Sequence, residues 1–319
     1  MPIRNEAPHL ERAVASILSQ DYPLAFDVCL AVAVSDDDTA TVAAAIAASR
    51  PRVTVVENPA GLTPAGLNAA IAATSGTVIV RVDGHAELSN GYIRRAVETM
   101  HRTGAVNVGG IQAARGETPF EEAVAAAMTS WMGTGGARFH VGGDQGSVDT
   151  VYLGVFDRAA GDAVGWFDET LVRNQDYELN IRLRQAGGMV WFDPELSVSY
   201  RPRGSVGALA KQYYEYGYWK AEVVGRNPGS IRARQLVPAL FPLILAGSVL
   251  AGPWRRAALL VPAGYAGAIA VAVGIGCRAR RCRFARLAAS LATMQISWGV
   301  GFNHRVLGHL TRSVVGRGE

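Results

Sequence analysis

Two short polar stretches carry the side chains best suited to chemistry. The first is Asp83-Gly84-His85, which follows the largely apolar, β-branched run Thr77 to Val82. Such a run predicts a buried strand, and a carboxylate and an imidazole at its end could bind a divalent metal that holds a phosphate group. The alternative is a turn that only ends the strand, because Asp and Gly are common in turns for backbone reasons.

The second stretch is the start of a helix predicted over residues 174–184, with Asp176 in its first turn. Leu179 and Leu183 lie four residues apart, as on the inner face of a helix, and Gly187-Gly188 ends it. A carboxylate held rigidly beside an acceptor hydroxyl could act as a general base. An acid in a first turn also stabilises the helix dipole, so the pattern alone leaves both interpretations open.

Acidic residues also stand beside two earlier elements. Asp36, Asp37 and Asp38 lie between a predicted strand and a predicted helix, where they could simply cap the helix. Glu6 precedes the first predicted helix, where it could contact a nucleotide or complement the helix dipole.

The expected elements alternate between strands and helices, which is the pattern of an α/β fold. Strands are expected at 28–34, 53–57, 77–82, 105–111, 149–156 and 190–199, and helices at 9–18, 39–49, 67–74, 91–103 and 174–184. Ligands of open α/β sheets bind beyond the carboxyl ends of the strands, which is where Asp83 is expected. No apolar run precedes the first helix, so we expect the native chain to begin several residues upstream, with a first strand.

Composition divides the 319 residues into two parts. Acidic residues occur throughout the chain up to about Gly225, but beyond Leu236 none occurs before Glu319. We therefore expect a soluble domain over 1–225 and a membrane-associated region over 226–319. The net charge of +4 comes largely from arginines around the apolar runs, which favours lipid headgroups over nucleic acid as the partner. Three cysteines, an odd number, and the lack of a signal peptide favour a cytosolic first domain.

The second region contains apolar runs about long enough to cross a bilayer, Leu236–Gly252 and Ala257–Gly276. A third run, Leu287–Phe302, is expected either to span the membrane or to lie in its interface. Arginines between residues 278 and 286 outnumber those between the first two runs, so the positive-inside rule places them in the cytosol. We expect a multi-pass inner-membrane protein with its first domain in the cytoplasm. A buried hairpin of a soluble protein is the alternative.

Residues 211–220 contain four tyrosines and one tryptophan. Aromatic side chains of this kind suit a membrane-interface belt, and they suit equally a cleft for a sugar or lipid acceptor.

Six motifs resemble, in this order, those of the family 2 glycosyltransferases, above all the membrane-attached bacterial enzymes of succinoglycan biosynthesis. They are Pro2–Glu6, Gly61–Asn68, Val82–His85, Gly133–Ala137, Asn174–Leu179 and Gln212–Lys220. The resemblance implies a GT-A fold, which is an α/β nucleotide-diphospho-sugar transferase domain, followed by membrane helices. It also implies an inverting hexosyltransferase of polysaccharide or glycolipid biosynthesis. The donor would be a nucleotide-diphosphate sugar, with a UDP-sugar favoured, and the acceptor would be lipid-linked.

By the same resemblance, Asp83 and His85 occupy the positions that bind a divalent metal, Mg²⁺ or Mn²⁺, and Asp83 also faces the donor diphosphate. Asp176 occupies the position of the catalytic base. A metal stabilises the leaving diphosphate, and a base deprotonates the attacking hydroxyl, so these residue types agree with the implied chemistry.

The remaining implied roles concern donor and acceptor recognition. Glu6, Asp37 and Asn68 would contact the donor. Gln175, Gln212 and Trp219 would lie on the acceptor or product side.

Three departures from the family pattern affect these roles. His85 replaces a second aspartate, and a nitrogen ligand suits Mn²⁺ at least as well as Mg²⁺. Val32 stands where an aspartate usually reads the nucleobase. Glu215 and Tyr216 follow Gln212 where processive synthases have Gln-x-x-Arg-Trp, which favours addition of a single sugar.

Two other functions remain open at this stage. A nucleotidyltransferase has a similar sheet with metal-binding aspartates, but it does not explain Asp176. A non-catalytic scaffold of a polysaccharide-assembly complex could retain the GT-A fold, although the intact Asp83 and Asp176 argue against it.

Overall fold

The computed structural model describes residues 1–279 and 284–315, and the chain forms two compact units. The first consists of residues 1–113 and 142–200, and the second of residues 114–141 and the described residues from 201 onward. The boundary expected near residue 225 therefore differs from the observed one at residue 200. The long helix that contains residue 225 packs within the second unit.

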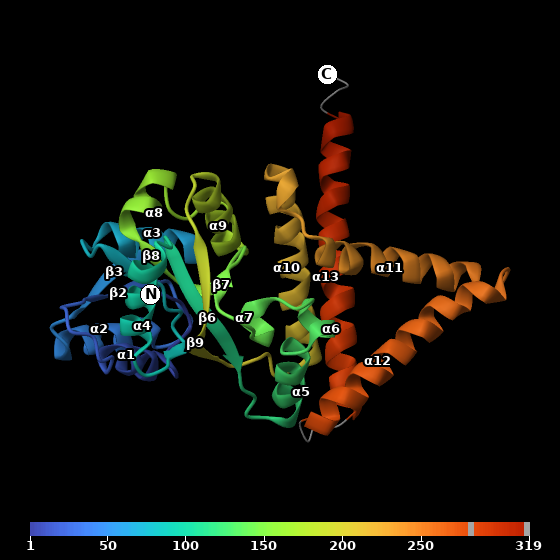
Figure 1. The fold of residues 1–319 in the computed structure, drawn as a ribbon, viewed down its shortest axis with the longest axis horizontal. Coiled ribbons are helices and arrows are strands. Elements are labelled where there is room, and N and C mark those ends of the chain that lie inside the picture. The colour runs from blue at the N-terminus through green and yellow to red at the C-terminus, as the bar shows by residue number, and fades with distance from the viewer. Residues whose placement is uncertain (280–283, 316–319) are drawn as a thin grey trace. The chain divides into compact units, whose positions relative to one another are not determined.

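The first unit opens with three parallel strands in the order β1-β2-β3 (Figure 1, blue). These strands are β1 (Pro2–Ile3), β2 (Val28–Ala33) and β3 (Val53–Asn58), and the helices α1 (Leu10–Leu18), α2 (Thr39–Ser49) and α3 (Thr63–Ala72) alternate with them. The βαβ pattern expected from the sequence is confirmed here. β1 is only two residues long, and the amino group of Met1 donates to the Cys29 carbonyl at 2.8 Å.

A second sheet follows, with the strand order β4-β8-β6-β9-β5 and with β7 paired to β9. Its strands are β4 (Val78–Val80), β5 (Glu87–Leu88), β6 (Asn107–Ala114), β7 (Gly146–Ser147), β8 (Tyr152–Asp157) and β9 (Val190–Tyr200). The helices of this part are α4 (Tyr92–Thr103), α8 (Arg158–Val164) and α9 (Gln175–Gln185). β4 pairs antiparallel with β8 at the end of the strand order.

The strand before Asp83 and the third helix differ from those expected. The strand expected over 77–82 has three residues and is only half-buried, because it lies at the edge of its sheet. The helix expected from residue 67 begins at Thr63, since Pro64 in its first turn has no N–H to leave unpaired and a backbone angle suited to a helix start.

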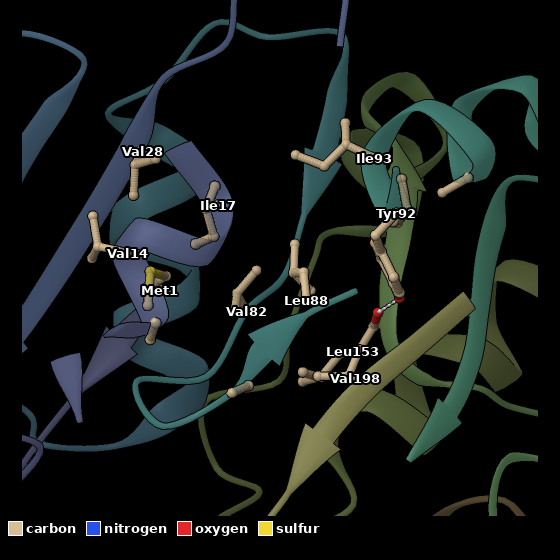
Figure 2. Close-up of a cluster of buried hydrophobic side chains, with 14 of the residues drawn as sticks. Met1, Val14, Ile17, Val28, Val82, Leu88, Tyr92, Ile93, Leu153 and Val198 are labelled. Carbon is tan, nitrogen blue, oxygen red and sulfur yellow. Dashed lines mark hydrogen bonds between the residues drawn. The ribbon is translucent and has the colours of Figure 1, made fainter. Parts of the chain in front are cut away.

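The core of the first unit joins its helices to both sheets. Leu10, Ala13, Val14 and Ile17 of α1 recur at helical spacing and are buried, as the apolar pattern predicts. Figure 2 shows this face of α1 beside Val82, with the Tyr92 hydroxyl donating to the Leu153 carbonyl at 3.2 Å. Val82 directly precedes Asp83 and is 1% exposed, so the chain at this point is anchored by packing.

The second unit is helical. It consists of α5 (Pro119–Met128), α6 (Trp131–Thr134), α7 (Arg138–Val141), α10 (Val206–Arg226), α11 (Ala233–Ala251), α12 (Leu260–Ala279) and α13 (Phe284–Val315), with short 3₁₀ turns at Pro228–Ser230 and Arg256–Leu259. α13 packs along α10 and also against α5 and α11. Glycine permits the close approach of α10, since a Cβ at Gly217 would lie 1.8 Å from the Trp298 carbonyl oxygen.

A buried carboxylate joins α10 to α13. Glu222 is 6% exposed and pairs with Arg226, Arg305 and His309. Burial by itself would raise the pKa of the Glu222 carboxyl, but its bonds to the two arginines lower it below its ordinary value. Pairing of this kind compensates the cost of removing a charge from water.

The apolar helices of the second unit bear on the expected membrane region. Among the described residues, one helix, the 21-residue stretch Arg256–Gly276, is long and apolar enough to cross a membrane. The apolar stretch of α11, Gln235–Ala251, is shorter, and the third expected run lies in α13 with Leu287 and Leu291 buried. Expected spans over 236–252 and 287–302 are thus not supported, and Arg280, Arg281 and Arg283 lie outside the described residues.

Candidate active site

The loop after β1 is fastened to the loop after β2. The hydroxyl of Thr39 accepts hydrogen bonds from the backbone N–H groups of Glu6 and Ala7, at 2.7 and 3.0 Å. Asp37 accepts from the Thr39 hydroxyl and also from the Ala7 backbone. The hydrogen bonds that Asp37 accepts lower the pKa of its carboxyl, and the bond from the Thr39 hydroxyl contributes most. Asp37 therefore orders the loop that carries Glu6.

Asp83 stands directly after the buried Val82, and it pairs with the side chain two residues before it. The Nε and Nη2 atoms of Arg81 donate to Asp83 Oδ1 at 3.3 and 3.2 Å. Burial by itself would raise the pKa of the Asp83 carboxyl, but the charge of Arg81, and then that of His85, lowers it below its ordinary value.

Asp176 lies in the first turn of α9, as the sequence predicts, and the same arginine reaches it. The Nη1 atom of Arg81 is 3.6 Å from Asp176 Oδ2. The two carboxylates singled out in the sequence, Asp83 and Asp176, thus share one cation although 93 positions separate them in the chain. Burial lowers the pKa of Arg81 and the two carboxylates raise it, with a net rise.

His85 pairs with Glu6. The distance from His85 Nδ1 to Glu6 Oε1 is 2.7 Å, and an ionised carboxylate can only accept, so Nδ1 carries the hydrogen. Gly84 permits this approach, because a Cβ there would lie 2.8 Å from Glu6 Cγ. The dipeptide Gly84-His85 therefore fits against the loop after β1.

A divalent metal fits these side chains. Among residues 1–279 and 284–315, no group of three or more His, Cys, Asp and Glu side chains could hold a metal. Mg²⁺-type sites of nucleotide-dependent enzymes, however, take one or two protein ligands and complete the coordination with substrate phosphates. A neutral His85 whose Nδ1–H bonds to Glu6 has its lone pair on Nε2, which is the arrangement typical of metal-binding histidines. Asp83 would add an oxygen ligand.

Asn68 positions a loop of the protein itself. Its Nδ2 atom donates to the Phe167 carbonyl at 2.8 Å and to Glu169 Oε1 at 2.9 Å, and its Oδ1 accepts from the Phe167 N–H. These contacts hold the segment that leads to α9 and Asp176. A direct contact between Asn68 and the donor stays a prediction.

The residues expected on the acceptor side belong to different units. Gln175 is buried at the start of α9 in the first unit. Gln212 and Trp219 lie in α10 of the second unit, where the Gln212 amide donates to the Tyr216 hydroxyl and Trp219 packs edge-on against Tyr218. Their acceptor roles stay predictions.

Unusual backbone conformations occur close to several of these residues. Asn5, Leu153 and Asn174 all have positive φ, at 55°, 42° and 60°, although none is glycine. Asn5 is adjacent to Glu6 and Leu153 to Tyr152, and Asn174 lies two positions before Asp176. Strained backbone of this kind concentrates at functional sites, and here it occurs in two loops and in strand β8, each next to or near a candidate residue.

Sequence reasoning missed two members of this group. Arg81 stands inside the expected apolar strand, where a charge signals a buried partner. Tyr152 is the second, because its pKa is raised well above the ordinary value by burial and by the Asp83 charge. No sequence pattern pointed to Tyr152.

A family model and two known proteins are similar to this chain in sequence. The model of Glycosyl transferase family 2 matches residues 1–165. The succinoglycan biosynthesis protein ExoA of Rhizobium meliloti (strain 1021) is 30% identical over 312 residues, which cover 96% of this chain and 94% of that protein. A Methanococcus voltae dolichyl N-acetyl-alpha-D-glucosaminyl phosphate 3-beta-D-2,3-diacetamido-2,3-dideoxy-beta-D-glucuronosyltransferase is 23% identical over 261 residues, or 79% of this chain and 80% of that protein.

Solved structures agree on the fold. A mannosyltransferase from Pyrobaculum calidifontis in complex with GDP-Man and Mn²⁺ has a TM-score of 0.68 at 18% identity, covering 96% of this chain and 85% of that one. S. aureus TarS in complex with UDP-GlcNAc has a TM-score of 0.51 at 14% identity, covering 70% of this chain and 64% of that one. The GT-A fold expected from the motifs is confirmed.

Removal of the Thr39 hydroxyl should destabilise the loop that carries Glu6. Thr39→Val keeps the shape of this fully buried side chain but removes the acceptor of the Glu6 N–H and one of the two acceptors of the Ala7 N–H. A buried donor without a partner costs about 1–3 kcal/mol, so the free energy of unfolding of the first unit should fall by that order in urea denaturation. Thr41→Val, at an exposed position of α2, is the control and should change it little. Equal stability of the two variants would show that the hydroxyl does not fasten the loop.

Proposed function

Because the chain belongs to the family 2 glycosyltransferases, we propose that it transfers one sugar, with inversion, from a nucleotide-diphosphate donor to a hydroxyl of a lipid-linked saccharide. The product would be a cell-surface polysaccharide or glycolipid. The observation that carries the proposal is the pairing of Asp83 and Asp176 with one buried cation, Arg81, because it unites a metal-binding carboxylate and a base in one site.

Asp176 is the base of this reaction. Its carboxylate is one-third exposed, so an acceptor hydroxyl can approach it from solvent. The acceptor oxygen attacks the anomeric carbon from the side opposite to the diphosphate, and Asp176 accepts its proton. One displacement of this kind inverts the anomeric configuration.

Asp83 and His85 would hold the metal and with it the leaving diphosphate. The metal, when bound, neutralises the charge that develops on the diphosphate oxygen as the sugar bond breaks. Glu6 orients His85 through Nδ1, so Glu6 serves the donor end through this histidine.

The donor is proposed to be a UDP-sugar. Of the similar structures, one holds GDP-Man with Mn²⁺ and another UDP-GlcNAc, so the fold accommodates either base. The loop fastened by Asp37 and Thr39 lies at the carboxyl ends of β1 and β2, where ligands of α/β sheets bind.

The acceptor is proposed to be lipid-linked and the enzyme to sit on the inner membrane, with α12 inserted and a cytoplasmic first unit. Large apolar side chains of α11 and α12 are exposed, and Trp254 between these helices is 83% exposed. These are, on α11 and α12, Leu236, Val237, Leu240, Leu243, Ile244, Val249, Leu250, Leu260, Val271 and Ile275. Exposed apolar surface of this extent is typical of membrane contact, and Trp254 and the adjacent Arg255 and Arg256 suit the headgroup level.

The base assignment is tested by Asp176→Asn. The amide matches the carboxylate in size but cannot accept the proton, so kcat should fall about 10²–10⁴-fold while the Kd of the donor stays near that of the wild type. Donor affinity is measured by calorimetry, and transfer by mass spectrometry of the product formed with a panel of donor sugars. Asp21→Asn removes an exposed carboxylate as a control and should retain activity. Near-normal turnover of Asp176→Asn would refute the assignment.

The metal assignment is tested on Asp83 and His85. Asp83→Ala should abolish the Mn²⁺-dependent part of donor binding, because it removes the oxygen ligand. His85→Asp should remain active and shift the preference from Mn²⁺ toward Mg²⁺, since it supplies a hard oxygen ligand. Metal affinity is followed by the electron paramagnetic resonance of Mn²⁺. Unchanged metal dependence in His85→Ala would exclude His85 as a ligand.

Membrane attachment is tested by a charge on α12. Val271 is 65% exposed on the helix long enough to span, so Val271→Lys should cost up to about 2.5–3.5 kcal/mol of insertion and release protein from the membrane fraction. Val34→Lys makes the same change at an exposed position of the first unit and should leave fractionation unchanged. Equal membrane retention of both variants would argue against α12 as an inserted helix.

A further inference from the structure

Arg81 is a buried cation whose charge the proposed reaction does not yet use. It is 6% exposed, although it stands in an apolar run between Val80 and Val82. Burial of a guanidinium without partners is costly, so its position requires compensating carboxylates. Both carboxylates that compensate it, Asp83 and Asp176, have proposed roles in the transfer.

Arg81 contacts Asp83 more closely than it contacts Asp176. Two of its nitrogen atoms share Asp83 Oδ1, at 3.3 and 3.2 Å. Its Nη1 atom lies 3.6 Å from Asp176 Oδ2, which is beyond hydrogen-bond length, and finds no hydrogen-bond partner among the described residues. Phe167 lies under the guanidinium, with its ring centre 5.9 Å from Cζ, in the segment that leads to Asp176.

We infer that Arg81 is a positioning residue for the sugar transfer, which sets the separation and orientation of the metal-binding Asp83 and the base Asp176. The inference rests on the proposed roles of these two carboxylates. A planar guanidinium has donors on opposite edges, so one rigid group can face a carboxylate on each side.

The open Nη1 contact indicates how the positioning operates. Catalytic hydrogen bonds are often long in a ligand-free enzyme and shorten in the substrate complex. A movement of Asp176 by less than about 1 Å brings it into hydrogen-bond range of Nη1. Arg81 thereby fixes the base relative to the donor end of the site, and misplacement by about 1 Å can cost about 100-fold in rate.

Lysine cannot reproduce this arrangement. Its ammonium group is a single compact charge on a flexible stem, so it can compensate Asp83 but cannot bridge two carboxylates in a fixed geometry. A purely structural cation, in contrast, would need only charge and volume. The two roles therefore differ in how a change at Arg81 combines with a change at Asp176.

The experiment is a double-mutant cycle of Arg81→Lys and Asp176→Glu in the full-length enzyme, with kcat, donor Kd in Mn²⁺ and thermal unfolding measured for each variant. Arg81→Lys should lower kcat about 10- to 100-fold and change the donor Kd much less. The double variant should lose clearly less than the product of the two single losses, because the longer carboxylate partly restores contact with the shorter cation. If Arg81→Lys does not fold, Arg81→Gln replaces it. The loss of kcat in the double variant with Asp176→Glu should again be smaller than the product of the two single losses.

Arg95→Lys is the matched control. Arg95 pairs with the buried Asp193 at 2.8 Å elsewhere in the first unit, so this variant should lower the unfolding temperature without coupling to Asp176→Glu in kcat. Losses that multiply in the Arg81 cycle, or a wild-type kcat in Arg81→Lys, would overturn the inference. Failure of the proposed function is a separate outcome, since it appears as undiminished transfer by Asp176→Asn whatever the Arg81 variants do.

Discussion

The burial of one positive charge constrains the first unit. Arg81 leaves the edge strand β4 with its guanidinium directed into the protein, where only ionised partners make burial tolerable. One partner, Asp83, lies two residues along the chain, and the other, Asp176, lies in the first turn of α9 after several intervening helices and strands. The conformation after β4 and the start of α9 therefore depend on the same cation. This dependence lets two segments remote in sequence form one chemical site.

Hydrogen bonds fasten the remaining loops around this ion pair. Thr39 and Asp37 hold the segment before α1, which places Glu6 against His85. Asn68 holds the segment before α9 through three hydrogen bonds. Several side chains that a motif comparison assigns to the donor thus contact the protein itself. They serve the site by fixing loops, a function compatible with donor contact by the same loops.

The second unit follows a different principle. Its helices approach closely through glycine, as at Gly217, and a buried Glu222 satisfies two arginines and a histidine between α10 and α13. α11 and α12 instead expose their apolar side chains. Exposed apolar residues on one pair of helices, beside a pair joined by buried ion pairs, would suit the proposed lipid-linked acceptor.

The sequence by itself determined the alternation of strands and helices, most element positions and the family, and it singled out Asp83 and Asp176 as candidate site residues. It could do so because apolar periodicity and short motifs are local signals. It did not determine the extent of β4, the start of α3, the division near residue 200 or the number of spanning helices, which depend on contacts between distant segments. Only the tertiary structure decided that Arg81 joins Asp83 to Asp176 and that Glu6 pairs with His85. Ion pairs between residues so far apart leave no periodic trace in a single sequence, since their partners are selected by burial and not by spacing.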